Sequence, residues 1–175
     1  MEALKTAICR VSAALDRAAS VVTVIALALL VGVVLLQVAA RYVIKQPPAY
    51  TEELARYAMI WAGLIGATMS FRRRFDPALM NGMKAGPGWL RAAAEFIRSL
   101  TVLIYLAPIL LFCFVGPNMN LSRGFLLRHS KTLAESMPFH TIWIAIAVPI
   151  MIVIIFVHVL ARWCGDDGDS NAASD

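Results

Sequence analysis

The sequence predicts an all-α integral membrane protein with four transmembrane helices and a short interfacial helix between the second and the third. Of its 175 residues, 60% are hydrophobic and only 15% are charged, and the mean hydropathy is +0.73. A small soluble globule cannot hide so much apolar side chain. The uncharged runs are also about as long as the ~20 residues that cross a bilayer. We therefore expect a single four-helix transmembrane domain over residues 1–163, followed by a disordered acidic tail over residues 164–175.

The first span is expected over residues 18–43, because no charge occurs from Ala18 to Ala40. A cleaved signal peptide is the competing interpretation, with residues 1–10 as its charged leader. The apolar run is longer than the ~7–15 residues of a signal core, however, and the leader is long and contains acids. These properties favour a membrane helix that is retained.

The second span is expected over residues 51–71. Its uncharged part, from Tyr57 to Phe71, covers only about 22 Å at ~1.5 Å per residue, less than the ~30 Å of the hydrocarbon core. The charged turn before it must therefore lie at the membrane boundary. That turn contains Glu52, Glu53 and Arg56.

The third and fourth spans are expected over residues 98–116 and 138–163. Each contains a proline, Pro108 and Pro149, and a proline inside a helix removes a backbone donor and bends the helix. Between the second and third spans, residues 76–99 indicate a turn and then a short interfacial helix that runs into the third span.

Four spans place both termini on one side of the membrane. Basic residues are enriched in cytoplasmic loops. The side of the termini would hold more basic residues than the opposite side. On the side of the termini they are Lys5, Arg10, Arg17, Arg72, Arg73, Arg74, Lys84, Arg91 and Arg162. On the opposite side they are Arg41, Lys45, Arg56, Arg123, Arg128 and Lys131. We therefore expect both termini in the cytoplasm, with Arg72, Arg73 and Arg74 as cytoplasmic anchors.

No enzyme, metal or cofactor site is expected. Cys9, Cys113 and Cys164 are isolated and lack the spacing of metal ligands. His140 and His158 would lie about 27 Å apart on one helix at ~1.5 Å per residue, too far to share a haem iron. Acids and nucleophiles do not converge at one depth, as a catalytic site would require. Much of the positive charge adjoins apolar segments, which indicates membrane anchoring and not nucleic-acid binding.

Small residues recur at helical spacing in the second span. They are Ala58, Ala62, Gly63, Gly66 and Ser70. Small side chains let helix backbones approach closely in lipid. Two uses remain open, which are packing inside the four-helix unit and an interface with a partner subunit.

The charged turn between the first two spans is the most informative feature. Glu52 and Arg56 are four residues apart, a spacing that supports a helical ion pair. A helix start with solvated charges would explain Glu52 and Glu53, but it explains less well why Arg41 and Arg56 lie at the same depth, where unpaired charge is costly. We therefore predict a structural polar cluster of Arg41, Glu52, Glu53 and Arg56 that links the two spans at the end opposite the termini.

Residues 37–76 resemble the small membrane subunit of the tripartite ATP-independent periplasmic (TRAP) transporters, the DctQ-like family. The family has a span ending in Arg-Tyr, a proline loop, an aromatic-Thr/Ser-Glu-Glu-x-x-Arg turn, and a span with Trp and Gly-Ala before a basic segment. The matching positions are Arg41-Tyr42, Pro47-Pro48, Tyr50-Thr51-Glu52-Glu53, Arg56, Trp61, Gly66-Ala67 and Arg72-Arg73. This chain departs at Tyr50, where the family usually has Trp, and in "RRRFDPALM", which lacks the usual Gly and His.

The resemblance implies a component of the bacterial inner membrane that works in the lipid bilayer beside a large DctM-like subunit. The large subunit would carry the substrate and Na⁺ sites, and a periplasmic binding protein would deliver an organic acid. The small subunit would be a scaffold without a cofactor, and the polar cluster would lie at its periplasmic end. Two rival hypotheses remain, a self-contained homo-oligomeric transporter or channel and a four-helix cytochrome-like redox module.

Overall fold

The computed structural model describes residues 2–43, 45, 48–73, 88–116, 119 and 123–165. Within these ranges the chain is mainly helical and has no named strand, and an isolated bridge joins Leu133 to His140. The helices are α1 (Glu2–Val43), α2 (Ala49–Arg72), α4 (Gly88–Phe114), α5 (Phe125–Lys131), α6 (Ile142–Ala145) and α7 (Ala147–Trp163). The all-helical class predicted from the sequence is confirmed for this part of the chain.

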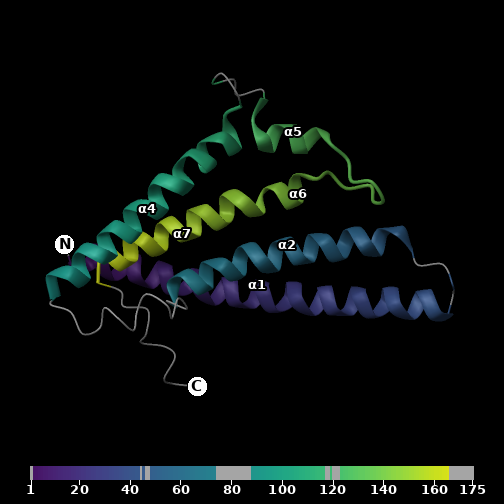
Figure 1. Ribbon diagram of the computed structural model, residues 1–175, viewed down its shortest axis with the longest axis horizontal. Helices are drawn as coiled ribbons and strands as arrows, with labels where there is room; N and C mark the ends of the chain where they lie inside the picture. The colour runs from purple at the N-terminus through teal and green to yellow at the C-terminus, as the bar shows by residue number, and fades with distance from the viewer. Residues whose placement is uncertain are drawn as a thin grey trace.

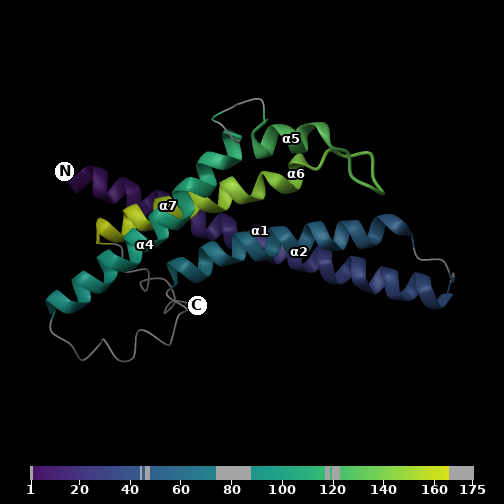
Figure 2. The same ribbon diagram turned by 45° about the horizontal axis from the view of Figure 1, so that its top comes forward.

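Helices α1 and α2 form a long antiparallel pair, which is visible in both views (Figures 1 and 2). The buried residues of α1 repeat every seven positions, and those of α2 include the same repeat. They are Ser12, Ala19, Ala26, Val33 and Ala40 on α1, and Thr51, Ala58 and Ile65 on α2. A strict seven-residue repeat keeps one seam facing the partner helix as in a coiled coil. Because most of these side chains are small, the two backbones can approach closely.

Helix α2 begins earlier than predicted. It starts at Ala49, directly after Pro48, and not at Thr51. Proline has a fixed φ and cannot donate a backbone hydrogen bond, so it suits the position before a helix. The hydroxyl of Thr51 donates to the carbonyl oxygen of Pro48 at 2.7 Å and does not accept from a helical N–H group.

Helix α4 is continuous from Gly88 to Phe114, with Pro108 inside it. The helix therefore begins about ten residues before the predicted third span, and its part that is apolar enough to cross a membrane begins at Ala93. Within the described residues no separate interfacial helix precedes it, because that segment forms the first turns of α4. Residues 74–87, the other part of the predicted turn, lie outside the described residues.

The predicted fourth span is divided into two helices that meet at Ile146. Pro149 explains the break, because a proline ring clashes with the carbonyl of the residue four positions earlier, here Ala145. Helix α5 was not predicted, and it contacts both α4 and α6 (Figure 1). Residues 132–141 connect α5 to α6 and are called the connecting hairpin below.

Three of the described helices are long and apolar enough to cross a membrane, within Glu2–Val43, Ala93–Phe114 and Ile142–Trp163. Helix α2 is not among them, because four charged residues lower its hydropathy. It is nevertheless 24 residues long and packs antiparallel against α1. The second span, which would make four in all, and the single domain over residues 1–163 remain predictions. The predicted acidic tail lies outside the described residues apart from Cys164 and Gly165.

Candidate functional site

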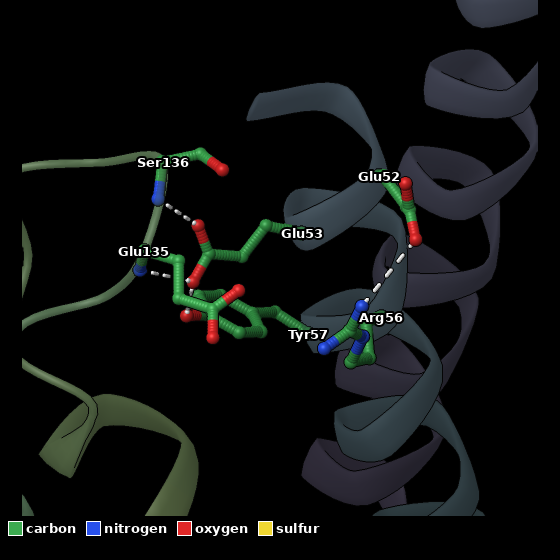
Figure 3. A network of polar contacts seen from close by, with 6 residues as sticks. All are labelled: Glu52, Glu53, Arg56, Tyr57, Glu135 and Ser136. Carbon is green, nitrogen blue, oxygen red and sulfur yellow. Dashed lines mark hydrogen bonds and ion pairs between the residues drawn. The ribbon is translucent and has the colours of Figure 1, made fainter. Parts of the chain in front are cut away.

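The first turns of α2 hold two adjacent glutamates with different environments (Figure 3). Glu52 pairs with Arg56 one turn later at 3.4 Å, and both side chains are mostly exposed. This i,i+4 ion pair matches the predicted spacing. Exposed pairs of this kind contribute little to stability. Glu53 is buried instead and points toward the connecting hairpin.

Three donors surround the carboxylate of Glu53. The backbone N–H groups of Glu135 and Ser136 donate to its two oxygens at 3.1 and 2.8 Å, and the hydroxyl of Tyr57 donates as well. Successive backbone N–H groups in a turn form a concavity that suits an anion. The tip of the hairpin is therefore an anion nest, and a side chain of α2 fills it.

The connecting hairpin is also fixed at its base. Ala134 N donates to the Phe139 carbonyl at 2.8 Å, and Thr141 N donates to the Thr132 carbonyl at 2.9 Å. The hydroxyl of Thr141 lies 3.2 Å from the carbonyl oxygens of both His129 and Thr132. The hairpin is thus tied to α5 at its base and to α2 at its tip.

Arg41 does not join the predicted cluster. It is exposed at the end of α1, and no ion pair connects it to either glutamate in the part of the chain that the structure describes. Among the described residues the structure therefore shows no contact of Arg41 with the cluster, and the link through Arg41 remains a prediction. The reason that Arg41 makes no such contact is geometric, because Ala40 occupies the seam that faces α2, and Glu53 faces the hairpin.

A second group of charges lies at the opposite end of the α1–α2 pair. The Oδ2 atom of Asp16 is 3.3 Å from Arg72 and 3.3 Å from Arg73. The side chains of Asp16 and Arg72 are only 10% exposed, and that of Arg73 is 43% exposed. Arg72 is therefore a buried partner of α1, and the role of Arg72 and Arg73 as cytoplasmic anchors remains a prediction. Arg74 lies outside the described residues.

Helix α7 joins this end of the molecule through Arg162. Its guanidinium donates to the carbonyl oxygen of Phe71 at 2.9 Å, lies 4.7 Å from the Phe71 ring centroid and pairs with Glu95 of α4 at 3.6 Å. The last carbonyls of a helix lack intrahelical donors, so Arg162 caps α2 from another helix. Ser12 and His158 add a buried contact of 2.9 Å between α1 and α7.

Sequence reasoning missed these contacts. The sequence offered one signal for these ion pairs, because Asp16 and Glu95 lie close to basic residues at the expected cytoplasmic boundary. Their partners are 56 or more positions away in the chain. The seven-residue repeat of small side chains in α1 was also present and could have identified the face that meets α2.

The small residues of the second span divide into two sets. Ala58 and Ala62 are buried, and Gly66 has Thr23 Cγ2 of α1 only 3.6 Å from the place where a Cβ would stand. Gly63 and Ser70 are exposed, and the space around Gly63 is open. The first set packs inside the chain, so an interface with another subunit remains a prediction for Gly63 and Ser70 alone.

Two of the three histidines make side-chain contacts in different parts of the structure. His158 contacts Ser12 in the interior, and His129 lies 2.9 Å from the Phe125 carbonyl oxygen within α5. Over the described ranges, no group of three or more His, Cys, Asp and Glu side chains could hold a metal ion. The hydrogen bonds and ion pairs described above join helix ends to other helices or to the connecting hairpin. Their role is therefore structural.

The comparisons with known proteins identify the family. A family model described as the DctQ component of the tripartite ATP-independent periplasmic transporters matches residues 30–167. The match includes the charged turn of α2, the connecting hairpin and Arg162, whereas Asp16 precedes it. The comparison with curated proteins finds no match. Because the family model covers well over half of the 175 residues, this chain belongs to the DctQ component family, the small membrane component of TRAP transporters.

Proposed function

We propose that this small permease subunit is a rigid scaffold for the large membrane subunit of a TRAP transporter. That transporter would couple the uptake of an organic acid to Na⁺ and receive its substrate from a periplasmic binding protein. Helix α2 would also cross the bacterial inner membrane, which makes four spans in all. Both termini would be cytoplasmic, and the connecting hairpin would face the periplasm. The family supplies the partners, and the contacts at both ends of α2 support the scaffold role.

The observation that carries the proposal is that α2 is held at both of its ends, to α1 at one and to the connecting hairpin at the other. Asp16 and Arg72 form a buried ion pair at one end, and Glu53 holds the connecting hairpin at the other. Breaking a buried ion pair leaves a buried charge uncompensated, which opposes relative movement of the two helices. A subunit built this way can provide a fixed surface against which a larger subunit moves.

The outer faces of the helices expose apolar side chains that a partner protein or lipid could cover. Side chains on α1 such as Leu35 and Ile25 are 64% and 61% exposed, and Ile104 and Tyr105 on α4 are 65% and 70% exposed. Large exposed apolar areas on a protein indicate contact with a membrane or another protein. Gly63 and Ser70 would let one of these partners approach α2 closely.

The test is reconstitution with and without this chain. The large subunit and the binding protein are placed in liposomes, and uptake of a labelled organic acid is measured under an inward Na⁺ gradient and under a matched K⁺ gradient. We expect uptake only when this chain is present and only with Na⁺. Uptake by this chain in liposomes without the large subunit would contradict the scaffold role and support the self-contained transporter.

Assembly is tested separately from transport. Glu53→Gln should loosen the hairpin and lower co-purification with the large subunit, whereas Glu52→Gln should not. The two variants remove the same charge from adjacent positions, so the pair is a matched control. Equal co-purification of both variants with the large subunit would remove the support that the hairpin gives to the proposal.

A further inference from the structure

A groove of about 500 Å³ lies between α2, α5, the connecting hairpin and the start of the last membrane helix. Its apolar lining comes from all of these elements and includes Ile60, Phe125, Leu133, Ile144 and Val148. Phe125 is 39% exposed and Leu133 is 59% exposed. The groove has the volume of a ligand pocket, for which ~300–1,000 Å³ is typical, and apolar side chains in it are still uncovered.

Three charged side chains also line this groove. Glu53 is held by the hairpin N–H groups and Tyr57, and the other two are of opposite charge. Arg56 projects from α2, and its side chain is 58% exposed although it pairs with Glu52. Glu135 projects from the connecting hairpin and is exposed. Its backbone N–H is used by Glu53, but its carboxylate forms no ion pair within the described ranges. Figure 3 shows both side chains beside Tyr57, which lines the groove as well.

The depth of the groove follows from the length of α2. Its uncharged part from Tyr57 to Phe71 spans only about 22 Å at ~1.5 Å per residue, so Arg56 must lie at the boundary of the ~30 Å hydrocarbon layer. Ile60 is one helical turn deeper than Arg56. The groove therefore changes from charged to apolar along the same direction as a phospholipid changes from headgroup to acyl chain.

We propose that this groove binds one phospholipid with a phosphoethanolamine headgroup. The phosphate accepts hydrogen bonds from Arg56, the primary ammonium donates to the carboxylate of Glu135, and an acyl chain covers Phe125 and Leu133. Charge-assisted hydrogen bonds of this kind are the stronger ones. A choline headgroup has no N–H to donate, and a glycerol headgroup brings no cation to Glu135. The site depends on the hairpin position that Glu53 sets, and it does not depend on the transport role.

The first experiment asks whether the groove holds a lipid. The full-length chain is purified in a mild detergent, and retained lipids are identified by native mass spectrometry. Wild-type protein should carry one phosphatidylethanolamine. Val148→Trp should lose it because the indole fills the groove, whereas Leu35→Trp on the exposed face of α1 should keep it. Retention by Val148→Trp, or no retained lipid in wild-type protein, would overturn the proposal.

The second experiment tests the headgroup with variants at exposed positions, which should fold normally. Wild-type protein in nanodiscs should prefer phosphatidylethanolamine to phosphatidylcholine and to phosphatidylglycerol. Glu135→Gln should lower that preference about two- to fivefold, the range for an exposed ion pair. Arg56→Gln should weaken the binding of all three lipids by a similar factor, because the phosphate is common to them. Lys131→Gln, at the exposed end of α5, is the control. Equal binding of all three lipids to wild-type protein refutes the headgroup assignment.

A third measurement identifies the occupant in cells. A photoreactive benzophenone amino acid replaces Leu133 in the chain co-expressed with the large subunit. After irradiation, an adduct with the mass of a phospholipid supports the proposal. An adduct with the large subunit would show that a protein covers the groove, and it would overturn the proposal while leaving the scaffold role intact.

Discussion

Asp16→Asn should destabilise the protein more than any exposed charge change on the same helix. The carboxylate lies 3.3 Å from Arg72, and both side chains are 10% exposed. It lies at the same distance from Arg73, whose side chain is 43% exposed. Asparagine keeps the shape of the side chain and one acceptor oxygen, but it removes the negative charge that faces two guanidinium groups.

The magnitude follows from the two ion pairs taken separately. Removing one partner of a buried ion pair costs about 3–5 kcal/mol, and the pair with Arg72 is buried on both sides. The half-exposed pair with Arg73 adds less than ~1 kcal/mol. The amide oxygen of asparagine recovers about 1 kcal/mol as a hydrogen-bond acceptor. We therefore expect the free energy of unfolding to fall by ~3 kcal/mol.

The assay is equilibrium unfolding in mixed micelles with increasing dodecyl sulfate, followed by circular dichroism. Glu2→Gln is the matched control, because Glu2 pairs with Lys5 at 3.8 Å on the same helix but is 92% exposed. That variant should change the free energy by less than ~0.5 kcal/mol. A double-mutant cycle of Asp16→Asn with Arg72→Gln should give a coupling energy of about 1 kcal/mol or more. Equal effects of Asp16→Asn and Glu2→Gln would refute the reasoning.

Three further predictions concern the rest of the helix framework. Glu53→Gln should speed amide hydrogen exchange at the hairpin tip, whereas Glu52→Gln should leave it unchanged; identical exchange in both would contradict the anion nest. Ala62→Leu should cost about 1–3 kcal/mol of unfolding free energy by overpacking the buried face of α2. Gly63→Leu should leave the isolated chain folded and weaken binding of the large subunit, measured by co-purification. Arg162→Lys should lower the unfolding free energy about as much as Arg162→Gln. One ammonium cannot replace a planar guanidinium that contacts the Phe71 carbonyl, the Phe71 ring and the Glu95 carboxylate. Full stability of the lysine variant would disprove this.

Membrane helices could be located from the sequence because hydropathy is a local property. The uncharged runs in α1, α4 and α7 needed no knowledge of their neighbours. The boundaries were less accurate where helix continued outside the apolar run. Helix α4 starts at Gly88, because the segment before Arg98 is rich in alanine and other good helix formers. Hydropathy alone could not detect that extension.

In the charged turn of α2, some features were also predictable from the sequence and others were not. The depth argument placed Glu52, Glu53 and Arg56 at the end of a helix, and the spacing predicted the Glu52–Arg56 pair. The partner of Glu53 was not predictable, because backbone N–H groups of a loop carry no sequence signature. Arg41 was assigned by depth, but the face of α1 on which it lies decides whether it can reach α2.

By itself, the sequence determined the helical class, three apolar helices, the i,i+4 ion pair and the family resemblance, since each depends on composition or on spacing along one helix. Only the tertiary structure decided that Asp16 meets Arg72, that Arg162 caps α2 and that Glu53 holds the hairpin. These contacts join positions 56 to 91 residues apart. Charge and hydrogen-bonding capacity are properties of single residues, but the partner that satisfies them is chosen by how the helices pack.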